Sequence, residues 1–229
     1  MKRITVKELA KLDFFREIPK DILQNLLNES TVISCKKKEV IFHARERVES
    51  VYFILSGEVM LYNLTKHGNR KIIFILGAGR LLNQSIISRK PNALFGEAVC
   101  DTEILKIPEK FFVRLMSQSQ ELTDSVLREY ERNLWRMAHQ LKNTTGNMQT
   151  ERKIAAKLWK LGRDFGISTE EGIMVDIDLT ITLMADLVGI PRENVSRACK
   201  VLADRGLIRY GNKRFILTDF DGLAVFYKM

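Results

Sequence analysis

The spacing of apolar residues changes along the chain and divides it into parts. Residues 4–30 carry apolar side chains three and four positions apart, which predicts helix. From about residue 32 to residue 108, short apolar runs alternate with glycine-containing turns, a pattern typical of an antiparallel roll or barrel. The expected strands cover residues 40–42, 51–55, 58–62, 72–76 and 103–107. Helical spacing then returns, with Pro108 as a suitable first helical residue, so the predicted fold class is α+β.

A long helix is predicted over residues 121–144. Its apolar positions alternate spacings of three and four residues, which is the seam of a heptad repeat. The seam consists of Leu127, Tyr130, Leu134, Met137 and Leu141. Val126 and Trp135 lie off the seam, and we expect them to form a second apolar strip that packs on the chain's own β domain. Two strips indicate two partners, so a parallel homodimer is expected; the alternative is that the seam also packs on the β domain.

Two short helices joined by a tight turn are predicted further along, after an amphipathic helix at residues 152–161 and a strand at residues 173–177. The first covers residues 181–188 and ends at Gly189, since glycine adopts the left-handed conformation of a helix C-cap without a steric penalty. Pro191 then begins the second helix, because its missing N–H is harmless in a first turn. This spacing predicts a helix-turn-helix.

The second of these helices has two distinct faces. Val195, Ala198, Val201 and Leu202 are expected to pack inward. The outward face carries Arg192, Glu193, Ser196, Arg197 and Lys200. A charged helix face is often only solvated, but two arginines with a glutamate between them have the donors and acceptors to read guanine and cytosine edges. We therefore interpret this face as one that reads DNA.

The chain continues with a predicted hairpin, in which strands at residues 207–210 and 213–217 are joined by a turn at residues 211–212. It is interpreted as a wing, with Lys213 and Arg214 able to meet DNA phosphates. The polar segment at residues 143–147 is the predicted hinge. The whole chain is therefore predicted to have three parts: a sensor roll with flanking helices (residues 1–118), a dimerisation helix with hinge (119–147) and a winged helix-turn-helix DNA-binding domain (148–229).

The composition supports a nucleic-acid partner and excludes several other classes. The chain has 229 residues and a net charge of +9, a balance that suits a polyanion. Its 3 cysteines are widely separated, so neither a disulfide framework nor a metal cluster is expected. The N-terminus lacks a signal pattern and the apolar runs are far too short to span a membrane, so a cytoplasmic protein is expected.

The order of these parts resembles the cyclic-AMP receptor protein/FNR family of bacterial regulators. The most specific match is Leu187-Val-Gly-Ile-Pro-Arg-Glu-Asn-Val-Ser-Arg197, which is close to the family's recognition-helix pattern R-E-x-V-(S/G)-R. Weaker matches are Val51-Tyr-Phe-Ile-Leu-Ser-Gly-Glu-Val59 in the roll and Asp101-Thr-Glu-Ile-Leu-Lys-Ile-Pro108 at its exit. The resemblance covers roughly residues 12 to 218.

The resemblance implies a dimeric transcription regulator with double-stranded DNA, a second copy of itself and RNA polymerase as partners. By the family pattern, Arg192 and Arg197 would donate to guanine and Glu193 would accept from cytosine. Ser196 and Lys200 would touch phosphate or a flanking base. The half-site would resemble TGTGA within an inverted repeat. Ser196 also fits the branch that reads TTGAT-like sites, so the outer bases stay open.

The sensor part departs from the family's cyclic-AMP pattern, which has G-E-L after the fourth long strand and R-S a dozen residues later. The first segment here reads Gly79-Arg80-Leu81-Leu82-Asn83 and the second falls near residues 92–93. The long helix offers Ala138 and His139 in place of a hydroxyl pair. Cyclic AMP is therefore not expected. An iron–sulfur cluster would need a cysteine cluster, which the chain lacks. Haem would need an axial histidine in the roll or on its rim; His43 and His67 are the candidates, but His67 lies in a plain hairpin turn, and neither cofactor is expected.

Two hypotheses remain for the input to this protein. One is a different effector, bound between roll and long helix, in a pocket that would contain Arg80, Leu81, Asn83, Leu134, Met137, Ala138 and Leu141. The other is a constitutive regulator without an effector. An enzyme is not expected, because the three histidines are too scattered for a cupin-like metal barrel and no catalytic motif of a common class appears. A module that binds proteins but not DNA would be expected to lack the arginines of the reading face.

Overall fold

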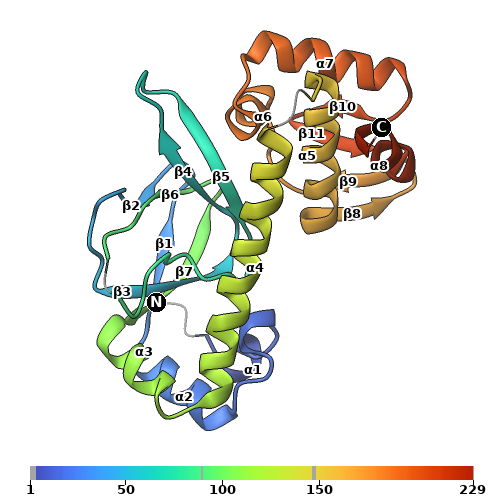
Figure 1. Ribbon diagram of the computed structural model, residues 1–229. Coiled ribbons are helices and arrows are strands. Elements are labelled where there is room, and N and C mark those ends of the chain that lie inside the picture. Colours follow the sequence, from blue (N-terminus) through green and yellow to red (C-terminus); the bar gives the residue numbers. More distant parts are fainter. Residues whose placement is uncertain (1–3, 89, 146–147, 229) are drawn as a thin grey trace. The chain divides into compact units, whose positions relative to one another are not determined.

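The computed structural model describes residues 4–88, 90–145 and 148–228, and the chain divides into two compact units (Figure 1). The roll unit comprises Met1–Asn63 and Ile73–Ala138. The C-terminal unit comprises Leu64–Ile72 and His139–Met229. The hinge predicted at residues 143–147 lies outside the residues whose side chains are described. None of the described helices is both long and apolar enough to cross a membrane.

The roll is built from two antiparallel sheets, with strand orders β1-β7-β3 and β2-β6-β4-β5. Its strands are β1 (Thr31–Cys35), β2 (Val40–Phe42), β3 (Ser50–Ser56), β4 (Val59–Leu64), β5 (Arg70–Leu76), β6 (Phe95–Ala98) and β7 (Thr102–Pro108). The side chains between the sheets are buried and apolar, among them Phe42, Ile54 and Leu61. The expected antiparallel roll and the α+β fold class are confirmed.

Strands β1 and β6 were not predicted from the sequence. Strand β6 contains Gly96 and Glu97, which are poor strand formers. Gly96 is required by packing, because a Cβ atom there would lie 2.7 Å from Cζ of Phe42. Glu97 is buried and accepts a hydrogen bond from the Tyr62 hydroxyl at 3.2 Å. Tertiary contacts, rather than local preference, therefore place β6 between β2 and β4.

One end of the roll is covered by helices that precede and follow its strands (Figure 1): α1 (Val6–Leu9), the 3-10 helix η1 (Asp13–Phe15) and α2 (Lys20–Asn28) before them, and α3 (Glu109–Met116) after them. Their core is aromatic. The ring of Phe53 on β3 lies 4.6 Å from that of Phe14, 4.9 Å from Phe15 and 5.7 Å from Phe112, centroid to centroid. Such offset contacts stabilise beyond the area they bury. Pro108 is the N-cap of α3 rather than its first residue.

The long helix α4 spans Gln120–Thr145. Leu122 and Val126 are buried against the aromatic core, as expected for Val126. Trp135 is 58% exposed, so the prediction that it shares a strip with Val126 is wrong. At about 100° per residue, positions nine apart lie on opposite sides of a helix. The inward face of α4 continues instead through Glu129, which is buried.

The C-terminal unit combines helices with a small antiparallel sheet in the order β10-β11-β9-β8. Its elements are α5 (Thr150–Phe165), β8 (Gly166–Thr169), β9 (Gly172–Val175), α6 (Ile181–Val188), α7 (Arg192–Asp204), β10 (Arg209–Gly211), β11 (Arg214–Leu217) and α8 (Phe220–Lys228). Strand β8 and helix α8 were not predicted from the sequence. Helix α8 packs on α5 through Phe220, whose ring stacks on Trp159 at 5.7 Å.

Candidate nucleic-acid interface

The first helix of the motif, α6, begins and ends where the sequence predicts. The Thr180 hydroxyl accepts a hydrogen bond from the Leu183 N–H at 3.0 Å and caps the N-terminus. Gly189 has φ +69° and its N–H donates to the Ala185 carbonyl at 2.8 Å. This left-handed C-cap turns the chain directly towards α7.

The inner face of α7 anchors the helix. Val195, Ala198 and Leu202 are buried as expected, but Val201 is 37% exposed, and its prediction as an inward residue is wrong. Cys199 takes that place because it lies four residues from Val195 and three from Leu202. Burial raises the pKa of the Cys199 thiol to about 11, so the thiol is neutral at pH 7 and fills the core.

Pro191 is the N-cap of α7, with extended backbone (ψ 141°), and the helix begins at Arg192. The proline was predicted one position further into the helix. In the N-cap position, the Pro191 carbonyl accepts from the N–H groups of Asn194 and Val195 at 3.0 and 3.1 Å. Arg192 and Glu193 therefore occupy the first turn of the helix.

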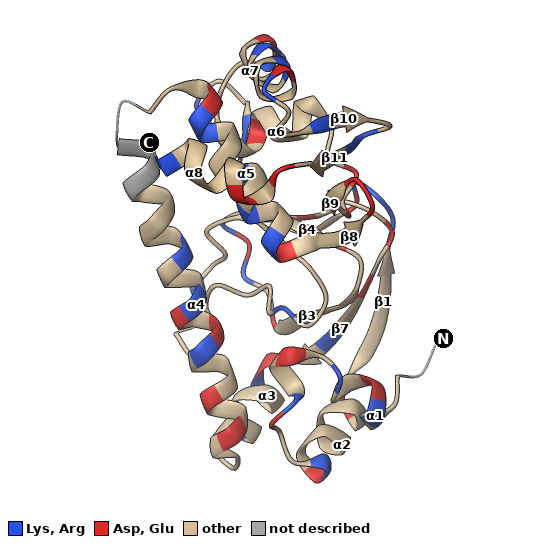
Figure 2. Ribbon diagram, turned by 90° about the vertical axis from the view of Figure 1, so that its right-hand side faces the viewer, with Lys and Arg blue, Asp and Glu red and all other residues tan. Residues whose placement is uncertain are grey.

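The outer face of α7 is open along its whole length. All five residues predicted there are exposed: Arg192, Glu193, Ser196, Arg197 and Lys200. They occupy positions i, i+1, i+4, i+5 and i+8, so residues three and four apart lie next to one another and the set forms one stripe along the helix. Figure 2 shows basic and acidic positions on α7. The stripe combines forked guanidinium donors with one carboxylate acceptor, which are the groups that read G·C pairs in the major groove.

Arg197 is held by a neighbour that was not predicted from the sequence. Its guanidinium donates to the side-chain oxygen of Asn194, three residues earlier on α7. This contact is neutral, so it orients the arginine without cancelling its charge. The signal available in the sequence was the i, i+3 spacing of the two residues.

The wing turn lies one position further along the chain than predicted. Gly211 pairs directly with Arg214, so the loop consists of Asn212 and Lys213, with φ +49° and +60°. Two successive positive φ angles define a two-residue hairpin turn of the primed type, which matches the twist of the strands. The predicted turn at residues 211–212 is therefore displaced by one position, and Lys213 lies exposed at the tip.

Arg214 differs from Lys213 because acidic residues surround it. It forms an ion pair with Asp176 and lies 3.9 Å from Asp178. The two aspartates follow β9 and were not identified from the sequence, since their partner is more than thirty residues away. A phosphate contact by Arg214 would compete with these carboxylates, whereas the position of Lys213 favours such a contact.

The residues predicted for an effector pocket occupy different environments. Leu81 is buried in the aromatic core. Asn83 is buried too, where it accepts from the Tyr52 N–H at 2.8 Å and donates to the Ser50 carbonyl at 2.9 Å. Its amide therefore ties the chain to β3. The remaining predicted positions on α4 are exposed: Leu134, Met137, Ala138 and Leu141.

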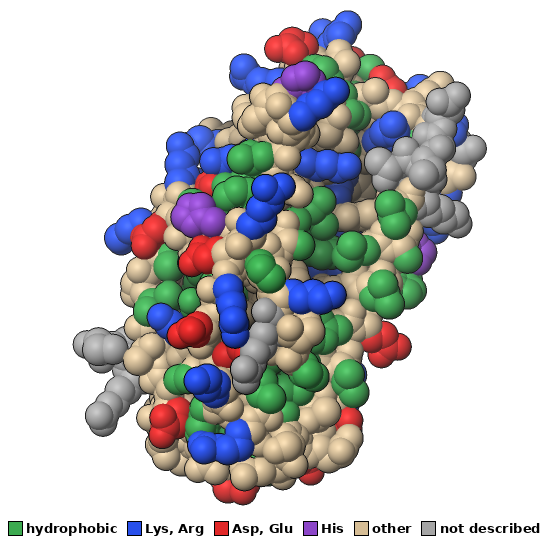
Figure 3. All heavy atoms as spheres, turned by 60° about the vertical axis from the view of Figure 1, so that its left-hand side comes forward, with side chains coloured by type: hydrophobic (Ala, Val, Ile, Leu, Met, Phe, Trp, Pro, Cys, Tyr) green, Lys and Arg blue, Asp and Glu red, His purple; other side chains and the backbone are tan. Residues whose placement is uncertain are grey.

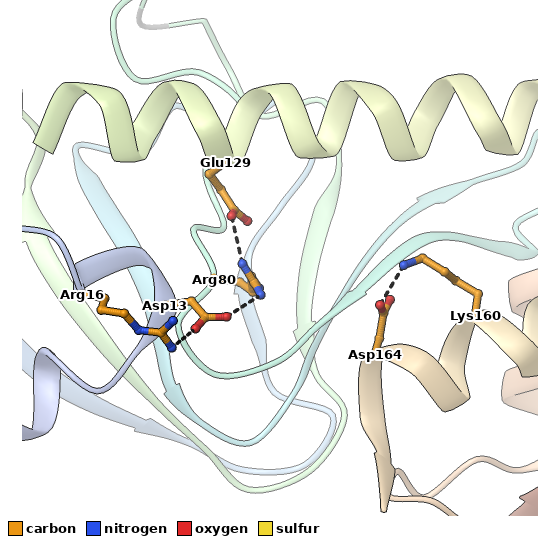
Figure 4. A network of polar contacts seen from close by, with 6 residues as sticks. All are labelled: Asp13, Arg16, Arg80, Glu129, Lys160 and Asp164. Atoms are coloured by element: carbon orange, nitrogen blue, oxygen red, sulfur yellow. Dashed lines mark hydrogen bonds and ion pairs between the residues drawn. The ribbon is translucent and has the colours of Figure 1, made fainter. Parts of the chain in front are cut away.

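Arg80 points from the chain after β5 towards α4 (Figure 4). Its guanidinium lies 3.2 Å from Oε2 of Glu129 and 3.4 Å from Oδ2 of Asp13. The pocket beside it is lined by Asp13, Phe14, Arg80, Ser125, Arg128, Glu129 and Arg132. Arg80 thus belongs to a pocket against α4, but with lining residues closer to the start of the helix than predicted.

The predicted dimer seam is exposed except at one position. Leu127, Leu134, Met137 and Leu141 are all exposed, whereas Tyr130 packs against the aromatic core. Desolvation raises the pKa of the Tyr130 hydroxyl, which has no hydrogen-bond partner among the described residues. The structure therefore divides the seam: Tyr130 contacts the chain's own roll, and the four aliphatic side chains face outward.

Charge alone does not single out a candidate nucleic-acid interface on the face drawn in Figure 3. In Figure 3, Lys and Arg side chains are spread over the face shown, with acidic and hydrophobic side chains between them. In the described parts of the chain, no group of three or more His, Cys, Asp and Glu side chains is placed to hold a metal ion. The distinctive feature is the stripe on α7, because a helix-turn-helix presents it.

These features define a winged-helix DNA-binding protein whose N-terminal part is a β-roll. Residues 32–119 match the family model of the cyclic nucleotide-binding domain, and residues 152–226 match that of the Crp-like helix-turn-helix domain. The chain belongs to the CRP/FNR family of transcription regulators. The resemblance seen in the sequence is confirmed.

Relatives match over nearly the full chain. A "CRP-like cAMP-activated global transcriptional regulator" of Mycobacterium tuberculosis is 23% identical over 217 residues, 94% of this chain and 96% of the relative. Among solved structures, a CooA mutant of Carboxydothermus hydrogenoformans has a TM-score of 0.77 at 18% identity, covering 99% and 97% of the two chains. FixK2 of Bradyrhizobium japonicum has a TM-score of 0.74 at 21% identity, covering 86% of this chain and 96% of FixK2. These structures share the fold.

Proposed function

We propose that the protein acts as a homodimer that reads an inverted DNA repeat, one TGTGA-like half-site per protomer. The observation that carries this proposal is the outer face of α7, where five polar side chains are exposed opposite a buried apolar face. Arg192 and Arg197 would donate to guanine and Glu193 would accept from cytosine. Ser196, Lys200, Lys213 and, after release from Asp176, Arg214 would contact phosphates or flanking bases.

The test is a fluorescence-anisotropy titration against TGTGA-N6-TCACA DNA and against a scrambled duplex of the same composition, in a salt series. Specific binding should exceed non-specific binding by about a thousandfold or more at physiological salt. Equal affinity for both duplexes would refute sequence reading. A matched duplex with TTGAT half-sites decides the outer bases, which Ser196 leaves open.

The proposed dimer uses the exposed part of the α4 seam, which is Leu127, Leu134, Met137 and Leu141. A two-stranded parallel coiled coil would bury these side chains against their counterparts. Sedimentation equilibrium should show a dimer for the wild type and a monomer for Leu134→Asp. Glu131→Gln, an exposed change on the same helix, is the control and should stay dimeric. A dimer that survives Leu134→Asp would contradict this interface.

In this proposal, residues 1–118 form the sensor roll, residues 119–147 the dimerisation helix and hinge, and residues 148–229 the DNA-binding domain. An effector other than cyclic AMP would bind between the roll and the long helix. The support is Arg80, an arginine only 17% exposed that reaches from the roll towards α4. The second candidate is a constitutive regulator, favoured by the two carboxylates that already balance Arg80. The expectation that the effector is not cyclic AMP is checked by calorimetry with cyclic AMP, which should show no binding. RNA polymerase remains a proposed partner.

A further inference from the structure

The pocket beside Arg80 lies within the roll unit and is formed by three separate stretches of chain. The helix η1 contributes Asp13 and Phe14, the chain after β5 contributes Arg80, and one side of α4 contributes the rest. Its volume is about 180 Å³. Pockets for drug-sized ligands are about 300–1,000 Å³, so this one suits a smaller molecule.

Glu129, one of the residues that line the pocket, has an unsatisfied carboxylate oxygen. Glu129 is 4% exposed, and its Oε2 is paired with Arg80. Its Oε1 is also buried but receives no hydrogen bond from any described residue. An ionised carboxylate is only an acceptor, so exchanging the two oxygens would leave the same deficit. Buried acceptors are almost always satisfied, and the missing partner here is a hydrogen-bond donor.

The rim of the pocket is cationic. Arg128 and Arg132 lie one helical turn apart on α4. Arg128 is 53% exposed at its side chain and contacts Glu17 and Ser125. Arg132 is half-buried and has no ion-pair partner in the part of the chain that the structure describes. The lining thus holds three arginines against two carboxylates, Asp13 and Glu129, which leaves one positive charge in excess.

We infer that this pocket binds a small acidic amino acid of the size of aspartate or glutamate. Its ammonium group would donate to Oε1 of Glu129, and its carboxylates would lie towards Arg132 and Arg128. A net charge of −1 on the ligand complements the excess charge of the lining. This inference rests on the proposed function, since it names the class of effector for the roll unit.

The first test compares L-aspartate with succinate by isothermal titration calorimetry on the full-length wild-type protein without DNA. The two probes differ only in the ammonium group, so their ratio of affinities isolates the contact with Glu129. A charge-assisted hydrogen bond to a buried carboxylate predicts that L-aspartate binds about tenfold or more tightly than succinate. Equal affinities, or no binding of L-aspartate, would overturn the inference.

The second test uses Glu129→Gln, with Glu131→Gln as the matched control on the exposed side of the same helix. In Glu129→Gln the preference for L-aspartate should disappear while succinate still binds, because the neutral amide supplies its own donor and no longer attracts an ammonium group. Retained succinate binding also shows that the variant is folded. Glu131→Gln should keep the preference. A preference unchanged in Glu129→Gln would overturn the inference.

The third arm uses Arg132→Ala, which should weaken both probes about tenfold or more, since both present carboxylates to the rim. Undiminished binding of both would contradict the assigned orientation. The anisotropy titration of DNA is run on the same preparations, both with and without L-aspartate. Sequence-specific DNA binding together with absent L-aspartate binding would refute this pocket alone. Absence of sequence-specific DNA binding in both titrations, while calorimetry shows that L-aspartate binds, would refute the proposed function alone.

Discussion

The outer face of α7 and the pocket beside Arg80 both depend on arginines, but in opposite surroundings. On α7, Arg197 is exposed and held by the neutral Asn194 side chain. In the roll unit, Arg80 is mostly buried and balanced by Glu129 and Asp13. An exposed arginine keeps its charge available to a partner, whereas a buried paired arginine first stabilises the fold. Residue type alone therefore does not identify a ligand contact.

The strongest way to test this contrast is to remove Arg80. Arg80→Met leaves the Glu129 carboxylate buried without its cation, which should lower the free energy of unfolding by about 3–5 kcal/mol. Urea unfolding followed by circular dichroism measures the change. The double variant Arg80→Met/Glu129→Met removes both charges and should recover most of the loss. A single variant as stable as the wild type would show that Arg80 is not structural.

Arg197→Ala tests the other side of the contrast. The loss of a bidentate guanine contact should cost about 1–3 kcal/mol of DNA binding per half-site and relax specificity at that base, with stability nearly unchanged. Anisotropy titrations of wild-type and variant half-sites measure both effects. Lys110→Ala removes an exposed positive charge in the roll unit and serves as the control. An equal loss of DNA affinity in the two variants would show that the effect comes from net charge and not from a base contact of Arg197.

Cys199 sharpens the comparison between the two faces of α7. Since burial raises the pKa of its thiol from 9.0 to about 11, the folded state keeps a proton that the unfolded state loses between these values. The unfolded state then binds fewer protons, so stability should fall by about 2 kcal/mol as pH rises from 9 to 11. Unfolding of wild type and Cys199→Ala across this range isolates the effect. If the free energies of unfolding of the wild type and Cys199→Ala changed in parallel with pH, the Cys199 thiol on the inner face would be accessible to water.

Lys213→Ala should give the smallest effect. If the lysine at the wing tip binds a phosphate, its removal should weaken binding to all DNA sequences alike. The slope of log affinity against log salt should become shallower by about 0.9 for each phosphate that is no longer neutralised. A salt series with specific and scrambled DNA checks this. A loss confined to the specific duplex would instead assign Lys213 to base reading.

Local spacing in the sequence predicted the parts of the fold that local rules control. The bounds of α6, the left-handed Gly189 and the exposed stripe on α7 all follow from helix periodicity and capping. The same rule, applied strictly, explains two of the errors: Cys199 rather than Val201 faces inward, and Trp135 lies opposite Val126. Val201 and Trp135 were assigned by hydrophobicity instead of angle.

Several features that were not predicted depend on contacts between distant residues. Strand β6 exists because Gly96 makes room for Phe42, and Arg80 finds its carboxylates 49 and 67 residues away. Arg214 likewise meets Asp176 across 38 residues. No short window of sequence contains both partners in any of these cases. The exposed outer face of α7, which lies on one helix, was therefore predictable, whereas most of the pocket lining, which comes from three segments, was not.

The two tryptophans give the molecule a built-in pair of optical reporters. Trp135 lies in the roll unit with its indole largely in solvent, and Trp159 lies in the C-terminal unit with its indole stacked on Phe220 and close to Tyr227. A solvated indole emits at longer wavelength than a stacked one. Single-tryptophan variants therefore let one fluorimeter follow the melting of each unit separately, without any attached dye.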